Sequence, residues 1–377
     1  MAKACPPPLF AVLSPRIAIN GRFLTQQASG VQRFAAETIK AIDALLDGDY
    51  AALKGRVELL APRGARNFPL RNIPMRRVGF FSGYLWEQLE FPLRARGALL
   101  LNLCMLGPLA TRRQIVVVHD ATVPALPENF SPRFRAAYNF LIPRLCQRAA
   151  MVATVSEFSR REIGKWYGGN VATMPVCFEG GDHITAVQAD DRLIERLGLK
   201  GRKFFLGVGV DSVNKNIKAV VSAFRKANIP DAMLVLTGAK DARVFGAVDL
   251  TQSDGVRVVG FISDGELRAL YEHAQALVFP SLYEGFGLPP LEAMTAGCPV
   301  IISEQPALAE VCDDAALHCR ADDAEQIAQH MRALAADPGL RARLSTAGRA
   351  RAKRFTWAAT GRALLDHCLS VGADRTA

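Results

Sequence analysis

The feature that most constrains the fold is an alternation of short, uniformly apolar runs with longer segments of helical pattern. A run that is apolar throughout is typical of a strand whose two faces are both buried. Such strands, when helices separate them, indicate a parallel sheet covered on both sides. In the first half of the chain we predict strands at 16–20, 57–62, 114–120 and 149–156, with helices at 30–46 and 131–149.

This alternation occurs twice along the chain. A glycine-rich stretch at 168–191 suits a linker. Beyond it, a second series predicts strands at 203–210, 232–238, 256–261, 276–281 and 298–303. The two series predict an α/β protein with two doubly wound, Rossmann-like domains that face each other across a cleft. We place the domains at 1–183 and 184–355, and we expect the C-terminal helix within 356–377 to pack back on the first domain.

The charge of the chain is unevenly distributed. The formal net charge of the 377 residues is +10, and the whole basic excess lies within 1–185. A basic half predicts a face that meets something anionic, such as a membrane surface, a phosphate-linked acceptor or nucleic acid. The simpler alternative is an arginine-rich surface that only keeps the protein in solution.

Neither a secretion signal nor a membrane span is predicted. Prolines interrupt the apolar part of the first 20 residues, which argues against a signal peptide. The longest nearly uncharged run, at 97–110, is too short for a bilayer and favours a buried strand and loop. The eight cysteines are scattered without a C-x-x-C pair, so we expect reduced thiols and a cytoplasmic location. Peripheral contact with the inner face of the membrane stays open.

One loop carries the clearest chemical signal. Residues 284–294, EGFGLPPLEAM, follow a predicted strand and lead into a helix, where parallel sheets bind ligands and helix N–H groups suit a phosphate. Gly285 and Gly287 allow the backbone to approach a ligand closely. Glu284 and Glu292, on either side, can accept hydrogen bonds from hydroxyl-rich rings. The spacing predicts one ligand with a sugar at each end and phosphate between. The alternative is a tight turn with a capping glutamate.

The stretch PSLYEGFGLPPLEAMTAGCPVI resembles the E-x7-E signature of retaining glycosyltransferases with the GT-B fold. The resemblance is to glycosyltransferase family 4 (glycosyl transferases group 1), and to its bacterial polysaccharide and lipopolysaccharide members. It covers nearly the full length and implies a GT-B fold and sugar transfer from a nucleoside-diphosphate sugar. Further stretches resemble the family, in the family's order, at 86–97, 117–132, 153–163, 259–281 and 307–317.

The resemblance implies a donor site in the second domain. Glu284 would contact the hydroxyls of the transferred sugar, and Glu292 would hold the ribose. Lys215 would bind the diphosphate and stabilise the leaving charge, a role that suits a lysine in a loop after an apolar strand. Many relatives have an arginine where this chain has Val210, so the diphosphate contacts are expected to differ there. The other donor-binding candidates are Gly285, Phe286, Gly287, Leu288, Gly209, Val210, Asn216 and, from the first domain, Gly30.

Four further candidates lie in the first domain. The resemblance places His119 near the donor sugar as a catalytic residue, although a histidine at a strand end is more often a satisfied edge residue. Arg33 lies one turn into the helix that begins at Gly30, and Ser156 opens another helix. Both have simpler interpretations, as a surface arginine and a helix cap. Asp120 is expected to fix the local turn. We include Arg33, Asp120 and Ser156 as acceptor or cleft candidates.

The implied reaction displaces a nucleoside diphosphate from the anomeric carbon with retention of configuration. The resemblance implies no metal and no cofactor besides the donor. The only Asp-x-Asp triplet, Asp47-Gly48-Asp49, falls in a predicted surface turn after a helix rather than after a strand. A mannosyl group carried on GDP is the first candidate donor, with UDP and dTDP sugars open. The expected acceptor is a lipid-linked glycan or a polysaccharide.

Two other classes of protein share this sheet architecture. A dinucleotide-dependent oxidoreductase needs G-x-G-x-x-G, but the nearest stretch, 207–212, lacks the third glycine. The chain also lacks the G-x-x-x-x-G-K-[ST] loop of an ATPase. A nucleic-acid binder would interleave basic and aromatic residues, which the basic half does not, so we expect no nucleic-acid partner. A binding protein for an anionic ligand remains the non-enzymatic alternative.

Overall fold

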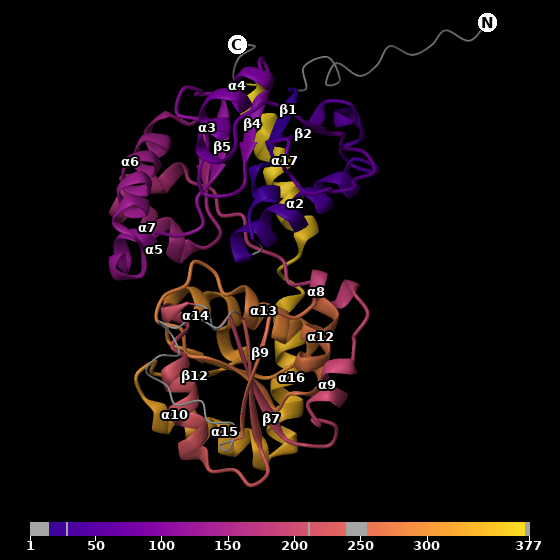
Figure 1. Ribbon diagram of the computed structural model, residues 1–377, viewed down its shortest axis with the longest axis vertical. Helices are drawn as coiled ribbons and strands as arrows, with labels where there is room; N and C mark the ends of the chain where they lie inside the picture. Colours follow the sequence, from indigo (N-terminus) through magenta and orange to yellow (C-terminus); the bar gives the residue numbers. More distant parts are fainter. Residues whose placement is uncertain (1–14, 28, 210–211, 239–254, 374–377) are drawn as a thin grey trace, which may run out of the picture. The chain divides into compact units, whose positions relative to one another are not determined.

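The computed structural model describes residues 15–27, 29–209, 212–238 and 255–373 (Figure 1). The chain divides into two compact units. The first unit comprises Met1–Glu179 together with Trp357–Ala377, and the second comprises Gly180–Thr356. The predicted division, after residue 183, lies slightly later in the chain. The structure enters the second unit earlier because Gly181 already packs against Leu291 of that unit.

The first unit contains a six-stranded parallel sheet in the order β3-β2-β1-β4-β5-β6, which is the Rossmann order. Its central strands are buried throughout, as uniformly apolar runs require. In register, Ile17 of β1 lies between Val57 of β2 and Leu99 of β4. The strands are β1 (Ile17–Asn20), β2 (Val57–Ala61), β3 (Met75–Arg77), β4 (Leu99–Asn102), β5 (Gln114–Val117) and β6 (Met151–Ala153).

The second unit repeats this topology. Its sheet has the order β12-β11-β10-β7-β8-β9, which is the same Rossmann order read from the other edge. All neighbouring strands in it are parallel. The strands are β7 (Phe204–Val208), β8 (Met233–Thr237), β9 (Val256–Gly260), β10 (Ala276–Phe279), β11 (Val300–Ser303) and β12 (Leu317–Cys319). The prediction of two Rossmann-like domains is confirmed.

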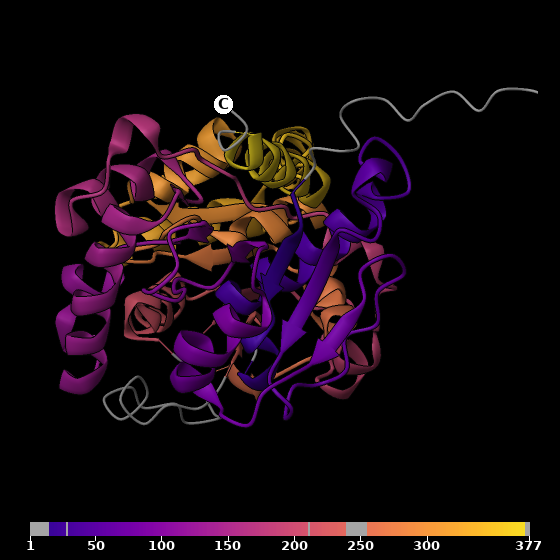
Figure 2. The same cartoon turned by 90° about the horizontal axis from the view of Figure 1, so that it is seen from above.

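Helices cover both faces of each sheet (Figures 1 and 2). The first unit has α2 (Gly30–Leu45), α3 (Gly83–Leu85), the π-helical turn η3 (Trp86–Glu90), α4 (Phe91–Arg94), α5 (Thr122–Ala125), α6 (Pro132–Arg148), α7 (Glu157–Tyr167) and α17 (Trp357–Ala373). The second has α8 (His183–Ala186), α9 (Arg192–Arg196), the short η6 (Val213–Lys215), α10 (Ile217–Ala227), α12 (Asp264–His273), α13 (Leu288–Ala296), α14 (Pro306–Cys312), α15 (Ala324–Ala336) and α16 (Pro338–Ala352).

The C-terminal helix α17 packs on α2 within the first unit. Gly361 has no side chain, and a Cβ there would lie only 3.3 Å from the Cβ of Ala41. The Tyr50 hydroxyl donates to Asp366 Oδ1 over 2.6 Å, so the segment after α2 is also bonded to the helix. Burial, together with this bond, raises the pKa of Tyr50 to about 12. Close helix contact and a partly buried hydrogen bond therefore join the C-terminal helix to α2 and to the segment that follows it.

Candidate functional site

Two loops of the second unit meet beyond the carboxyl ends of β7 and β10. These strands are neighbours at the point where the strand order reverses, which is where open α/β sheets bind ligands. One loop carries Lys215 and the other Glu284, and Lys215 Nζ donates to Glu284 Oε1 over 2.6 Å. The two side chains are only 17% and 11% exposed. The predicted phosphate-binding lysine and sugar-binding carboxylate thus form one ion pair.

Contacts between the two loops fix this ion pair. Asn214, next to the lysine in sequence, donates from Nδ2 to the backbone oxygen of Tyr283 at 2.9 Å. The Ser281 hydroxyl donates to Glu284 Oε1 at 2.5 Å. The lysine ammonium lies 4.8 Å from the centre of the Phe279 ring, within cation–π distance. The charged groups are therefore held by both loops and not by each other alone.

Asn216 takes part in the same framework. Its φ of 55° places it in the left-handed region, which asparagine tolerates, between η6 and α10. Its amide nitrogen donates to the backbone oxygens of Pro280 at 3.2 Å and Ala321 at 2.7 Å. The predicted donor-binding residue thus uses its N–H groups to tie the loop after β7 to two other loops of the unit.

Two glycines of the loops are required by their geometry. Gly287 has a φ of 113° and directly precedes α13, and a Cβ there would lie 2.6 Å from Leu308. Gly209 has a φ of 77°, and a Cβ there would lie 3.5 Å from Lys215 Cε. The backbone after β7 therefore passes close to the aliphatic part of the Lys215 side chain.

The side chains of the remaining loop candidates that the structure describes are buried or absent. The Phe286 ring is buried with its centre 5.9 Å from that of Phe355, so its side chain belongs to the core of the unit. Gly285 precedes it, and Leu288 is the first residue of α13. Val210 lies outside the described residues.

Glu292 lies one turn into α13 and is 5% exposed. Its Oε1 lies 2.9 Å from His183 Nε2, and its Oε2 accepts from the Tyr271 hydroxyl at 3.1 Å. Burial, and then the nearby Glu292, raise the pKa of Tyr271 well above 10, so Tyr271 is a hydroxyl donor at neutral pH. A carboxylate has about four acceptor positions, and the contacts with His183 and Tyr271 occupy two of them.

In the first unit, His119 is buried after β5. Its Nε2 donates to the backbone oxygen of Leu103 over 2.8 Å, which places the proton on that nitrogen. Its Nδ1 lies 3.6 Å from Glu179 Oε1, and its ring meets that of Phe34 edge to face at 4.7 Å. The ring is thus held by one hydrogen bond to a carbonyl and lies beside a carboxylate and an aromatic ring.

The other first-unit candidates have identifiable structural partners. Asp120 Oδ1 accepts from the Thr122 backbone N–H at 2.9 Å, so Asp120 fixes the turn as predicted. The Ser156 hydroxyl accepts from the Ser159 N–H at 2.9 Å and caps α7. Gly30 is the exposed first residue of α2. One turn further along this helix, Arg33 Nη1 lies 3.6 Å from Glu37 Oε1.

A buried polar network in the first unit was not predicted. Glu87, which is buried, accepts through Oε1 from Arg22 Nε at 2.9 Å and from Asn20 Nδ2 at 2.9 Å. Burial raises the pKa of Glu87, while the charge of Arg22 opposes this effect. Asn20 also donates to Asn102 Oδ1 at 2.9 Å. Through Glu87, the stretch at 86–97 therefore contributes to the buried core of the unit. No local sequence pattern could have revealed this network, because Asn20 and Glu87 are 67 positions apart.

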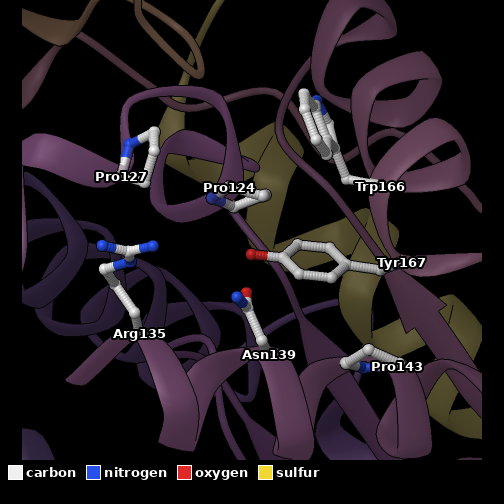
Figure 3. Close-up of a pocket in the computed structure, with 7 residues that line it drawn as sticks. All are labelled: Pro124, Pro127, Arg135, Asn139, Pro143, Trp166 and Tyr167. Carbon is white, nitrogen blue, oxygen red and sulfur yellow. The ribbon is translucent and has the colours of Figure 1, made fainter. Parts of the chain in front are cut away.

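A pocket of about 320 Å³ opens in the first unit beside α5, α6 and α7 (Figure 3). The Tyr167 side chain is buried, and its hydroxyl has no hydrogen-bond partner among the described residues. Figure 3 shows this hydroxyl pointing between Pro124 and Asn139. The neighbouring Trp166 is exposed. The lining residues are Pro124, Pro127, Arg135, Asn139, Pro143, Trp166 and Tyr167.

Among the described residues, no group of three or more His, Cys, Asp or Glu side chains is arranged to hold a metal ion. The two acidic residues of the Asp-x-Asp triplet bind cationic side chains instead. Asp47 accepts from Lys54 at 2.7 Å, and Asp49 pairs with Arg362. Within the ranges that the structure covers, no helix is long and apolar enough to cross a membrane.

The solved structure of sucrose-phosphate synthase from Thermosynechococcus elongatus is similar to this fold. Its TM-score is 0.72 at 20% sequence identity, over 95% of this chain and 99% of that chain. At this identity the similarity concerns the fold alone.

Sequence comparisons extend this similarity. The family model of glycosyl transferases group 1 matches residues 190–351, which include Lys215, Glu284 and Glu292. The chain is 30% identical over 263 residues to O-antigen chain mannosyltransferase B of Escherichia coli, covering 66% of this chain and 68% of that protein. It is 30% identical over 215 residues to O-antigen chain mannosyltransferase RfbU of Salmonella typhimurium, covering 56% and 58%. By this similarity the chain belongs to the family of glycosyl transferases group 1.

Proposed function

We propose that the chain is a retaining glycosyltransferase of glycosyltransferase family 4 that moves a hexose from a nucleoside-diphosphate sugar to a hydroxyl of a lipid-linked glycan or polysaccharide. The observation that carries the proposal is the Lys215–Glu284 ion pair at the topological switch point of the second unit. The two relatives named above are O-antigen chain mannosyltransferases, which supports a mannosyl donor, with GDP-mannose as the first candidate.

In the proposed reaction, the bond between the anomeric carbon and the diphosphate oxygen breaks, and its electron pair stays on that oxygen. The acceptor oxygen bonds to the same face of the carbon, and its proton passes to the leaving phosphate. Lys215 stabilises the charge that develops on the diphosphate. Glu284 accepts hydrogen bonds from the hydroxyls of the transferred sugar and so places its anomeric carbon.

The ion pair suggests how the site exchanges partners. Leaving one member of a largely buried pair without a counter-charge is strongly unfavourable. A donor would present its diphosphate to Lys215 and its sugar hydroxyls to Glu284, so both groups keep a partner when the pair opens. Ser281, which donates to the same Glu284 oxygen, would hold the carboxylate in place during this exchange.

The positive charge of the proposed site comes from protein groups. Lys215 is one source, and the N-terminus of α13, which begins at Leu288, is another. Glu292, one turn along the same helix, would bind the ribose while His183 and Tyr271 hold its carboxylate. The proposal therefore includes metal-independent transfer without a further cofactor.

The pocket in the first unit is the proposed subsite for a sugar of the acceptor (Figure 3). The exposed Trp166 offers an aromatic face on which a sugar ring can pack. The buried Tyr167 hydroxyl lacks a protein partner among the described residues, so a sugar hydroxyl would satisfy it. Asn139 and Arg135, which line the same pocket, add polar groups at its edge.

Thermal unfolding with different ligands tests the proposed donor class. A ligand at about 100 times its Kd stabilises the folded state by about 2.7 kcal/mol, which raises the Tm by several degrees. We expect this shift with GDP or another nucleoside diphosphate, and a smaller shift in Lys215→Met. Lys218→Met, at an exposed lysine of α10, is the matched control. Stabilisation by NAD or an oligonucleotide, with none by any nucleoside diphosphate, would rule the proposal out.

A further inference from the structure

The first unit carries a stripe of exposed leucines on a short helical run. Leu85, Leu89 and Leu93 are 59%, 51% and 71% exposed and recur every four residues along α3, η3 and α4. In an α-helix, positions four apart drift by about 40° around the axis. The π-helical turn at Trp86–Glu90 takes more residues per turn, so it reduces this drift and keeps the leucines on one side.

The opposite side of the run is anchored in the core of the unit, so the helix cannot rotate to bury the leucines instead. Trp86 and Phe91 are fully buried, with stacked rings 5.3 Å apart, and both belong to a core cluster with Leu100 of β4. Trp86 Nε1 also donates to the backbone oxygen of Val78 over 2.8 Å. Because these anchors fix the rotation of the helix, exposure of the leucines is a property of the folded chain.

Two phenylalanines extend the apolar surface at the start of the run. Phe80 and Phe81 are 75% and 50% exposed. The Glu90 carboxylate accepts from the backbone N–H groups of both, at 2.8 to 2.9 Å, and so ties them to the helix. Gly79, with a φ of 86°, makes the preceding turn, where a Cβ would lie 2.2 Å from Glu90 Oε2. The phenylalanines are thus held in place by backbone contacts.

The charges around this surface are basic. The Arg63 guanidinium lies 4.3 Å from the centre of the Phe80 ring, and Arg94 and Arg96 lie one and three residues after Leu93. All three arginines are exposed, and none forms an ion pair with another described residue. The carboxylates of the run are already engaged, since Glu90 bonds the loop and Glu87 is buried with Arg22.

We infer that the stripe formed by Phe80, Phe81, Leu85, Leu89 and Leu93 docks the protein on an anionic lipid bilayer. Exposed apolar side chains beside unpaired arginines are the combination that binds the boundary between headgroups and acyl chains. A run of this length lies in the plane of the interface and does not span it. The basic excess of residues 1–185 adds attraction at longer range.

Vesicle co-sedimentation of the full chain tests the inference. The wild type is expected to bind vesicles that contain phosphatidylglycerol and to bind pure phosphatidylcholine weakly. Binding should weaken as the salt rises from about 0.1 M to about 1 M, which shortens the Debye length from about 10 Å to about 3 Å. The variant Leu85→Ser/Leu89→Ser/Leu93→Ser should bind these vesicles at least about tenfold more weakly than the wild type. Phe261→Ser, at a 62% exposed residue of the second unit, should bind as the wild type does.

Wild-type affinity in the triple variant, or no wild-type binding to anionic vesicles, would overturn the inference. If the wild type forms a dimer that the triple variant does not form, and the wild type does not bind vesicles, the stripe serves self-association. That result would also overturn the inference. Because the leucines are exposed, an unchanged Tm should show that the variant is folded. An assay of nucleoside diphosphate release in solution separates the docking inference from the proposed function. If the protein binds vesicles but releases no nucleoside diphosphate from any nucleotide sugar, the enzyme proposal is rejected and the docking inference stands.

Discussion

Lys215 and Glu284 illustrate how one contact can serve a site in two states. In the structure they neutralise each other over 2.6 Å, in largely buried surroundings. In the proposed donor complex each would exchange its partner for a group of the nucleotide sugar. Since an isolated charge is unfavourable in this setting, the ion pair gives each group a counter-charge before the donor arrives.

At this scale, the sequence indicated candidate residues but not the partners that these residues have in the structure. The spacing of the glycine-rich loop indicated Glu284 and Glu292, and the family resemblance added Lys215. Neither the spacing nor the resemblance indicated that Glu292 contacts His183, which lies 109 positions away, or that it accepts from Tyr271. Such pairs depend on how strands and helices pack, and no local pattern of residues records them.

Glu292→Gln tests the proposed ribose contact. A glutamine still accepts from Tyr271, but a charge-assisted hydrogen bond to the ribose is lost. Such a bond contributes about 1.5–3 kcal/mol, so we expect the donor KM to rise by about 10- to 100-fold. Because ribose binding is equal in the ground and transition states, kcat should change little. Steady-state kinetics measures both values, with Glu325→Gln on α15 as the control. A fall in kcat at unchanged KM would instead place Glu292 in the chemical step.

At the scale of elements, long uniform patterns were predictive and short ones were not. The apolar runs of both halves are confirmed as strands, including β4 within the run at 97–110. β3 was missed because it has three residues, of which Arg76 and Arg77 are exposed. β12, which also has three residues, was missed for the same reason of length. The π-helical turn η3 fits neither a helical nor a strand period, so periodicity could not reveal it.

Tyr50 links α17 to the segment after α2 in a way that alkaline pH can test. Its pKa is about 12 in the folded state, against about 10 in an unfolded chain. The folded state therefore holds this proton more tightly. The stabilisation is complete below pH 10 and is lost as the pH rises through about 12.

The corresponding variant is Tyr50→Phe. Without the bond to Asp366 it should be less stable than the wild type by about 1 kcal/mol at pH 8, and the difference should shrink towards pH 11. Urea unfolding at several pH values measures this difference. Parallel stability curves for the two proteins would show that Tyr50 does not titrate as described.

At the scale of the whole molecule, the two units carry different candidate functions. The second unit holds Lys215, Glu284 and Glu292 within the span of the family model. The first holds the basic excess, the pocket at Tyr167 and the exposed leucines. The two-unit organisation could be predicted because the series of apolar runs occurs twice. The pocket and the leucine stripe could not, because exposure is decided only when helices pack.

The most direct test of the central claim is nucleoside diphosphate release from a panel of nucleotide sugars that includes GDP-mannose, with a saccharide acceptor and in EDTA. The wild type should turn over one of these donors, and Lys215→Met and Glu284→Gln should each lower kcat by about 10²- to 10³-fold. Lys218→Met should match the wild type. Because Lys215→Met and Glu284→Gln each break the ion pair, their Tm is expected to be lower, and a cooperative thermal transition would show that each variant is folded. Full turnover in both site variants would contradict the assignment of this ion pair to the reaction.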